Sequence, residues 1–313
     1  MTDTLDRSPH PDDDPGRPLD AAARAAALAD LPMTSPSPRG GIRGVLEHRY
    51  LLRLLVKREV TARYTGSLLG MVWSYVNPLT QFLMYSFIFA LIGRGMKIEN
   101  FAIHVFAALM VTSLFTETVA QGTRSIVRNS SLLQKSAMPR ETFPVASLLV
   151  SIYHLWPEFV ILGIALFFVG WRPDVTAIAA GLLGYSVIVV FALALALALS
   201  VSQVFLRDTG QVVQIVNNFI RFGVPMMYPY SIVAQRFHGH TDIYLANPIA
   251  NAVLLVQRCF WVPTTSDIDE TVQVHMPDHL FTRGFIALGV ALALLFVAQK
   301  IFTRFENKIP ERL

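Results

Sequence analysis

The sequence predicts an all-α protein that crosses a lipid bilayer several times, on three observations. Apolar residues make up 53% of the chain and charged residues only 15%, whereas a soluble domain carries about 25% charged residues. Six apolar blocks have the length of roughly 20 residues that a helix needs to cross the hydrocarbon core. These blocks are continuous and do not alternate with a period of two residues, which excludes a membrane-spanning β-barrel.

The first 43 residues are expected to form a disordered cytoplasmic head. Seven of the 18 prolines lie in residues 1–43, together with the acidic run 12–14, and no aromatic residue is present there. Such a segment buries too little apolar surface to offset the entropy that is lost when a chain becomes ordered. It also lacks the basic start and apolar block of a secretory signal peptide.

Residues 44–64 predict an amphipathic interface helix. Leucines and basic residues each repeat there at helical spacing, namely Leu51, Leu54 and Leu55, and Arg49, Arg53 and Lys57. A basic amphipathic helix directly before a membrane span is expected to lie in the headgroup region. The alternative is an ordinary solvated helix of a cytosolic domain.

Residues 65–313 are expected to form a transmembrane domain with six spans, at 68–92, 101–121, 144–169, 175–205, 211–233 and 284–303. Basic residues concentrate before the first span, in the loop 122–143 and at the end of the chain. Because loops rich in Lys and Arg stay in the cytoplasm, both termini are expected on the cytoplasmic side of the plasma (inner) membrane. The apolar stretch 248–262 is short for a span and contains Arg258, so a re-entrant segment on the outer side is predicted.

The first span predicts one face that is polar and aromatic. On a helical wheel, an arc of about 160° carries Ser74, Tyr75, Asn77, Gln81, Phe82, Tyr85 and Phe89. Polar groups without partners are costly in hydrocarbon, so this arc is expected to face protein or a hydrated path. Two interpretations fit. The arc could line a glycan conduit, with aromatic rings stacked on sugars, or form a helix–helix contact through Asn77 and Gln81.

Ionisable residues within the predicted spans are functional candidates, among them Glu117, His154, Glu158 and Arg221. Glu117 is expected near the cytoplasmic end of its span, within reach of water. His154 and Glu158 are four residues apart around Pro157, which predicts either a structural pair at a kink or a proton relay. Arg221 is expected deep in the fifth span, facing an acidic or phosphate group or a structural partner.

No catalytic, cofactor or metal site is predicted in the chain. The motifs G-x-x-x-x-G-K-[ST], H-E-x-x-H and G-x-S-x-G are absent from the sequence, so any ATP and Mg²⁺ would be bound by another chain. The outer-loop histidines His238, His240, His275 and His279 favour a solvated loop over a metal site. The single cysteine, Cys259, is expected to be inert, and a net charge of +4 gives no reason to expect nucleic-acid binding.

Several segments together resemble the permeases of type-2 ABC exporters of cell-surface polysaccharides. The first is KREVTARYTGSLLGMVWSYVNPL (57–79), where such permeases enter their first span. The second is the cytoplasmic loop IVRNSSLLQKSAMPRETFPVA (126–146), and the third is MMYPYSIV (226–233) followed by LANPIANAVLLVQR (245–258). The resemblance covers about 45–310, and its nearest groups are exporters of O-antigen, teichoic acid and galactan.

The resemblance implies a homodimer that works with two copies of a cytosolic ATPase and exports a lipid-linked polysaccharide, of galactan or O-antigen type, along the dimer axis. It implies ATPase coupling through Arg128, Asn129, Leu132, Leu133, Lys135 and Pro139. It also implies an entrance gate that meets lipid phosphates, formed by Arg53, Lys57, Arg58, Glu59, Arg63 and Tyr64. Two alternatives stay open: an exporter of a drug or small lipid, and a membrane transferase that uses His154 and Glu158.

Overall fold

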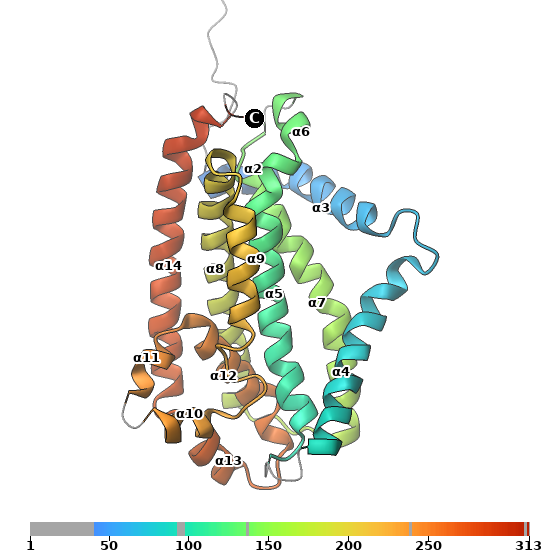
Figure 1. Ribbon diagram of the computed structural model, residues 1–313, viewed down its shortest axis with the longest axis vertical. Helices are drawn as coiled ribbons and strands as arrows, with labels where there is room; N and C mark the ends of the chain where they lie inside the picture. Colours follow the sequence, from blue (N-terminus) through green and yellow to red (C-terminus); the bar gives the residue numbers. More distant parts are fainter. Residues whose placement is uncertain (1–40, 93–97, 136–137, 238–239, 310–311, 313) are drawn as a thin grey trace, which may run out of the picture. The chain divides into compact units, whose positions relative to one another are not determined.

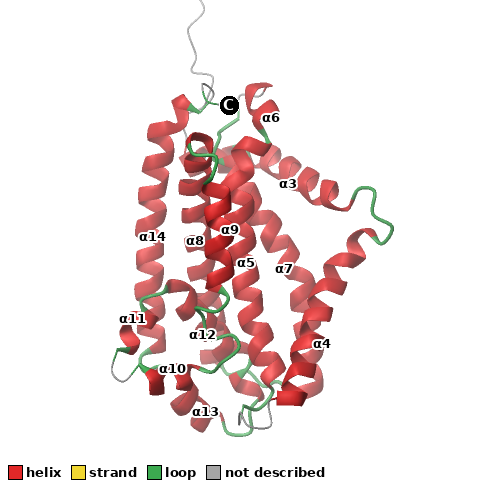
Figure 2. Cartoon of the chain, in the orientation of Figure 1, coloured by secondary structure: helices red, strands yellow, loops and turns green. Residues whose placement is uncertain are grey.

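The computed structural model describes residues 41–92, 98–135, 138–237, 240–309 and 312. These residues form helices, turns and loops, and none of them belongs to a strand (Figure 2). The prediction of an all-helical chain is therefore confirmed for this part. The predicted head lies outside the described residues up to residue 40, whereas residues 41–43 already belong to helix α2 (Gly41–Glu47).

Four helices are long and apolar enough to cross a membrane. They are α5 (Phe101–Arg128), α7 (Thr142–Val169), α8 (Val175–Phe205) and α14 (Leu280–Phe305), and they correspond to the predicted spans two, three, four and six. They run along a common direction (Figure 1), and α5 is the most buried of them. The chain is therefore an integral membrane protein.

Small residues set the close packing between these helices. A Cβ atom added to Gly122 of α5 would lie 2.5 Å from the Cβ of Ala196 in α8. A Cβ on Gly184 would lie 2.9 Å from Val256 and 3.0 Å from the carbonyl oxygen of Ala252. Small residues at helix contacts let backbones approach, which is how apolar helices associate in a membrane where lipid is equally apolar.

The stretch expected to be re-entrant forms helix α12 (Pro248–Phe260), packed against α5, α8 and α14. Its 13 residues would span about 20 Å at 1.5 Å per residue, less than the thickness of the hydrocarbon core. Asn247 caps its start by accepting a hydrogen bond from the backbone N–H of Ile249. The short helices α10 (Tyr230–Arg236), α11 (Thr241–Leu245) and α13 (Ile268–His275) lie at the same end of the molecule (Figure 1).

The two remaining predicted spans are shorter or broken. The first begins with the 3₁₀ turn η1 (Gly70–Val72) and continues as α4 (Trp73–Ile92). The block 211–233 is not one continuous helix, because α9 (Thr209–Ile220) ends after 12 residues and residues 221–229 are non-helical. Pro225 and Pro229 lack the N–H that a helix needs and disfavour helical backbone at the preceding residue. The count of six spans therefore stays a prediction.

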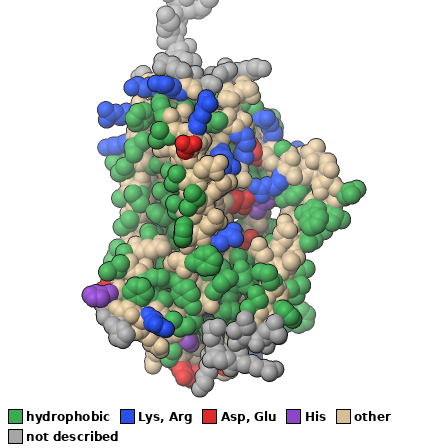
Figure 3. Space-filling model, viewed as in Figure 1, with side chains coloured by type: hydrophobic (Ala, Val, Ile, Leu, Met, Phe, Trp, Pro, Cys, Tyr) green, Lys and Arg blue, Asp and Glu red, His purple; other side chains and the backbone are tan. Residues whose placement is uncertain are grey.

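The predicted interface helix 44–64 is two helices, α2 and α3 (Arg49–Tyr64), which meet at His48. Leu52 and Leu55 of α3 are buried, whereas Arg53, Lys57 and Arg58 are exposed, as an amphipathic helix requires. Helix α3 packs against α7 and lies at the same end of the molecule as α6 (Ser130–Lys135) (Figure 1). Lys and Arg side chains gather at this end, above flanks that are largely hydrophobic (Figure 3).

Candidate functional site

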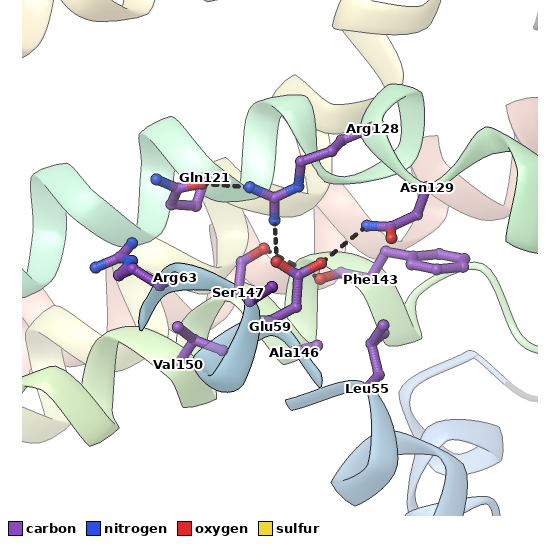
Figure 4. Close-up of a pocket in the computed structure, with 11 residues that line it drawn as sticks. Leu55, Glu59, Arg63, Gln121, Arg128, Asn129, Phe143, Ala146, Ser147 and Val150 are labelled. Atoms are coloured by element: carbon purple, nitrogen blue, oxygen red, sulfur yellow. Dashed lines mark hydrogen bonds and ion pairs between the residues drawn. The ribbon is translucent and has the colours of Figure 1, made fainter. Parts of the chain in front are cut away.

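A cavity of about 290 Å³ is enclosed between the interface helix α3 and the adjoining parts of α5 and α7 (Figure 4). Three helices contribute its walls: Leu55, Glu59, Ala62 and Arg63 of α3; Gln121, Arg128 and the cap residue Asn129 of α5; and Phe143, Ala146, Ser147 and Val150 of α7. The polar side chains come mostly from α3 and α5, and the apolar wall mostly from α7. The site is therefore amphipathic and is bordered by the start of the predicted coupling segment.

Glu59 ties the interface helix to the end of α5. Its carboxylate forms an ion pair with Arg128, at 2.9 Å between Nη2 and Oε2. It also accepts a hydrogen bond from Asn129 Nδ2 at 3.3 Å, and both contacts are drawn in Figure 4. Arg128 in turn donates to Gln121 Oε1 at 2.7 Å. Asn129 also caps α5, so the first residues of the predicted coupling segment, Arg128 and Asn129, both contact Glu59.

A second set of contacts joins α3, α5 and α7 one turn further along α3. Glu117 Oε1 lies 2.7 Å from Arg63 Nη1 and 2.9 Å from His154 Nδ1, and the two nitrogens are 2.8 Å apart. Arginine can only donate and a carboxylate can only accept. The Nδ1 atom therefore either donates to Glu117 or accepts from Arg63, so the triad has two hydrogen-bond arrangements.

These contacts correct two predictions. His154 does not pair with Glu158, whose carboxylate instead accepts hydrogen bonds from Ser113 Oγ at 3.1 and 3.2 Å. Both side chains find their partners on α5, because α5 packs along α7. Glu117 does not simply reach water either, since its side chain is only 23% exposed and is held by Arg63 and His154.

The end of the interface helix is also bonded to the start of the first predicted span. Tyr64 and Ser74 share a hydrogen bond between their hydroxyl groups. The Tyr64 ring meets the His154 ring edge-on, with 6.3 Å between centroids, and Tyr153 donates to the sulfur of Met71 at 3.4 Å. The turn between α3 and α4 is thus attached to α7.

The remaining predicted gate residues lie on the outside of α3. Arg53, Lys57 and Arg58 are exposed, and none of the three forms an ion pair with another residue in the part of the chain that the structure describes. Their charges are therefore open to ligands. This separates them from Arg63 and Arg128, each of which already has a carboxylate partner.

The predicted coupling residues occupy α6 and its flanks. Arg128 and Asn129 contact Glu59, Leu132 is half-buried, and Leu133 packs against a hydrophobic cluster at this end of the molecule. Pro139 is buried. The side chain of Lys135 lies outside the described residues.

The arc expected to line a channel is divided in the structure. Phe82 packs edge-on against Phe106, with 5.2 Å between centroids, and Tyr85 packs against the same core. Tyr75, Asn77 and Gln81 are exposed, and Ser74 is bonded to Tyr64. The side chain of Phe89 lies outside the described residues.

Arg221 does not lie within a continuous fifth span. It is the exposed cap residue at the end of α9, because the helix stops shortly before Pro225. Among the described residues it has no acidic partner.

Ser113 and Gln121 are site residues that the sequence reasoning missed. A signal for them exists in the sequence, because Ser113, Glu117, Gln121 and Arg128 recur at helical spacing and share a face of α5 within about 80° at 100° per residue. A polar stripe of this kind inside an apolar helix indicates a buried contact.

Comparison with known proteins identifies the family of the chain. Residues 50–260 match the model of the ABC-2 type transporter family. The chain is 24% identical over 248 residues to the O-antigen export system permease protein RfbA of Klebsiella pneumoniae, covering 78% of this chain and 90% of that protein. It is 25% identical over 280 residues to a protein of the same name from Myxococcus xanthus, covering 87% and 98% respectively. Because the family match runs from the interface helix to α12, the chain belongs to the ABC-2 type transporter family.

Proposed function

We propose that this chain is the membrane subunit of an ATP-driven exporter of a lipid-linked polysaccharide, of O-antigen or galactan type, in the plasma membrane. The observation that carries the proposal is the cavity between α3, α5 and α7, where one carboxylate, Glu59, joins a basic interface helix to the start of the coupling segment. The names of the two relatives support the choice of polysaccharide over a drug or small lipid.

The topology that goes with this function has six spans and both termini in the cytoplasm. The four long helices supply four spans, and α4 and the region of α9 supply the other two. Helices α10 to α13 then lie on the outer side, with α12 re-entrant. The gathering of Lys and Arg at the end with α3 and α6 supports this orientation (Figure 3).

The carrier lipid enters beside the interface helix. Arg53, Lys57 and Arg58, exposed and without ion-pair partners among the described residues, bind the phosphates of the carrier and of membrane lipids, since a guanidinium holds phosphate through paired hydrogen bonds. The Glu59–Arg128 pair is partly exposed, with side-chain exposures of 21% and 43%. Ion pairs of this kind contribute only about 0–1 kcal/mol, so the phosphate can compete with Glu59 for Arg128.

Energy comes from an ABC ATPase that binds ATP and Mg²⁺, with two copies on a homodimer of this chain. The coupling segment docks on the ATPase, and its movement reaches α3 through Asn129, Arg128 and Glu59. The glycan then passes between the two copies, along a path to which α4 presents Tyr75, Asn77 and Gln81.

The test is co-expression of the chain with its ABC ATPase, followed by purification in lipid nanodiscs. We expect the two proteins to co-purify and lipid-linked polysaccharide to raise the rate of ATP hydrolysis. Reversing two coupling charges together, Arg128→Glu and Lys135→Glu, should abolish that stimulation without preventing folding. Arg304→Glu, an exposed charge near the same end of the molecule, is the matched control and should leave the stimulation intact.

Three outcomes contradict parts of the proposal. Stimulation that survives the double charge reversal refutes the coupling segment. A chain that turns over a substrate without any ATPase points instead to a membrane transferase, although in the structure His154 and Glu158 are engaged by different residues. Stimulation by a drug or small lipid in place of polysaccharide would reassign the cargo.

A further inference from the structure

A second cluster of buried charges lies beyond the other end of the coupling segment. It consists of Arg140 and Glu141, which directly precede α7, and Glu306 in the 3₁₀ turn η4 (Glu306–Lys308) that follows α14. Their relative exposures are 8%, 1% and 5%. Charged side chains are almost never buried to this degree unless they are paired, so this cluster must hold segments of the chain together.

The contacts join the start of α7 to the end of α14. Gln299 of α14 donates a hydrogen bond from Nε2 to Glu141 Oε1 at 2.9 Å. Arg140, next to Glu141 in the sequence, is buried too; burial lowers the pKa of its guanidinium, and the charges of Glu306 and Glu141 oppose this shift. Burial raises the pKa of Glu141, and the charge of Glu306 raises it further.

Helix α2 closes the cluster from a third side. A Cβ atom on Gly44 would lie 3.6 Å from Pro139 Cγ, and one on Gly41 would lie 3.0 Å from Gln299 Nε2. Beside the charges, Val45 of α2 packs in one buried hydrophobic group with Met138, Phe143, Phe302 and Ile309. Three parts of the chain that are far apart in sequence therefore meet where the coupling segment ends.

The two ends of the coupling segment are thus held in different ways. At its start, the Arg128–Glu59 pair is partly exposed beside the cavity. Contacts with water can replace such an ion pair at little cost in free energy. At its other end, four consecutive residues, 140–143, are each at most 8% exposed. Separating a buried charge from its partners leaves it without compensation, which is strongly unfavourable.

We propose that Glu141 and Gln299 are positioning residues that fix the far end of the coupling segment to α14 and α2. The segment then turns about this fixed end, and the displacement is delivered at its start, through Glu59, to the interface helix. The inference rests on the proposed function, because it takes the ATPase to be the source of the movement.

Crosslinking tests the inference on the complete transporter, in a Cys259→Ala background. One pair of cysteines, Gly44→Cys with Pro139→Cys, bridges the fixed end. A second pair, Ala62→Cys with Gln121→Cys, bridges α3 to α5 across the cavity at the moving end with a bifunctional thiol reagent and leaves the Glu59–Arg128 pair intact. Each variant is compared with its own uncrosslinked form, so effects of the substitutions themselves cancel. We expect stimulated ATP hydrolysis to be retained when the fixed end is bridged and lost when the moving end is bridged.

A conservative substitution provides the second measurement. Glu141→Gln keeps an acceptor for Gln299, so lipid-linked polysaccharide should stimulate ATP hydrolysis by its complex as in the wild type. Glu141→Ala should still co-purify with the ATPase, but ATP hydrolysis by that complex should no longer be stimulated. Loss of stimulation on bridging Gly44 to Pro139, or normal coupling by Glu141→Ala, would overturn the inference while leaving the proposed function intact. Failure of the wild-type chain to bind an ATPase would overturn both.

Discussion

Glu117 is predicted to be the residue on which the contact between α3, α5 and α7 depends most. In the arrangement in which His154 Nδ1 donates, the carboxylate of Glu117 accepts from both Arg63 and His154. The side-chain exposures of Glu117, Arg63 and His154 are 23%, 39% and 11%. Glu117→Ala removes the acceptor for two groups at once. Arg63→Ala removes one donor and leaves the bond between Glu117 and His154 in place.

The expected magnitudes follow from exposure. The bond from His154 is largely shielded from water, and a hydrogen bond to a charged group contributes about 1.5–3 kcal/mol. The pair with Arg63 is more than a third exposed on the arginine side and so adds about 1 kcal/mol or less. Glu117→Ala should therefore destabilise the protein by about 2–4 kcal/mol, and Arg63→Ala by about 1 kcal/mol or less.

Thermal unfolding of the purified chain in lipid nanodiscs measures both effects, with Glu117→Gln as a variant that keeps the shape and one acceptor. A loss of 1 kcal/mol corresponds to a fall in melting temperature of about 2–4 °C for chains of 150–250 residues, so Glu117→Ala and Arg63→Ala should be separable. Equal losses for Arg63→Ala and Glu117→Ala would refute the reasoning, because they would show that the exposed ion pair and not the shielded bond stabilises the contact.

Two further predictions concern helix packing and acid stability. Gly122→Ala should lower the melting temperature, because its new Cβ would lie 2.5 Å from that of Ala196 and overpacking costs about 1–3 kcal/mol. Gly163→Ala is the matched control, since its new Cβ would meet no atom within 4 Å. Equal melting temperatures for the two variants would contradict the close packing of α5 against α8. The pKa of the Asp174 carboxyl is lowered from its usual value of 3.8 by hydrogen bonds from Thr176 and the backbone N–H of Ala177 and by the charge of Arg258. The ionised carboxylate therefore stabilises the folded protein above that pH. This stabilisation is lost as the pH falls through the lowered pKa. Asp174→Ala should lower the free energy of unfolding by about 1 kcal/mol at neutral pH, as expected for the loss of a helix N-cap. It should also make the free energy of unfolding less dependent on pH below about 4. An unchanged dependence of stability on pH would show that the cap is not formed.

Much of the candidate site was within reach of sequence reasoning, but its pairings were not. The resemblance to polysaccharide-exporter permeases pointed to Glu59, Arg63 and Arg128. That Glu59 faces Arg128 depends on α3 crossing the ends of α5 and α7, which no spacing within α3 reveals. The expected pairing of His154 with Glu158 was wrong for the same reason.

The sequence by itself determined that this protein is helical, lies in a membrane and begins its membrane domain with an amphipathic helix. Continuous apolar blocks of bilayer length can satisfy their backbone only as helices in lipid, and this constraint acts on each segment separately. The tertiary structure decided which charged groups pair and where α12 is buried. These features depend on which faces of the helices meet. In a lipid environment, which is as apolar as the helices, the faces that meet are set by close packing, such as that of Gly122 against Ala196, and not by hydrophobicity alone.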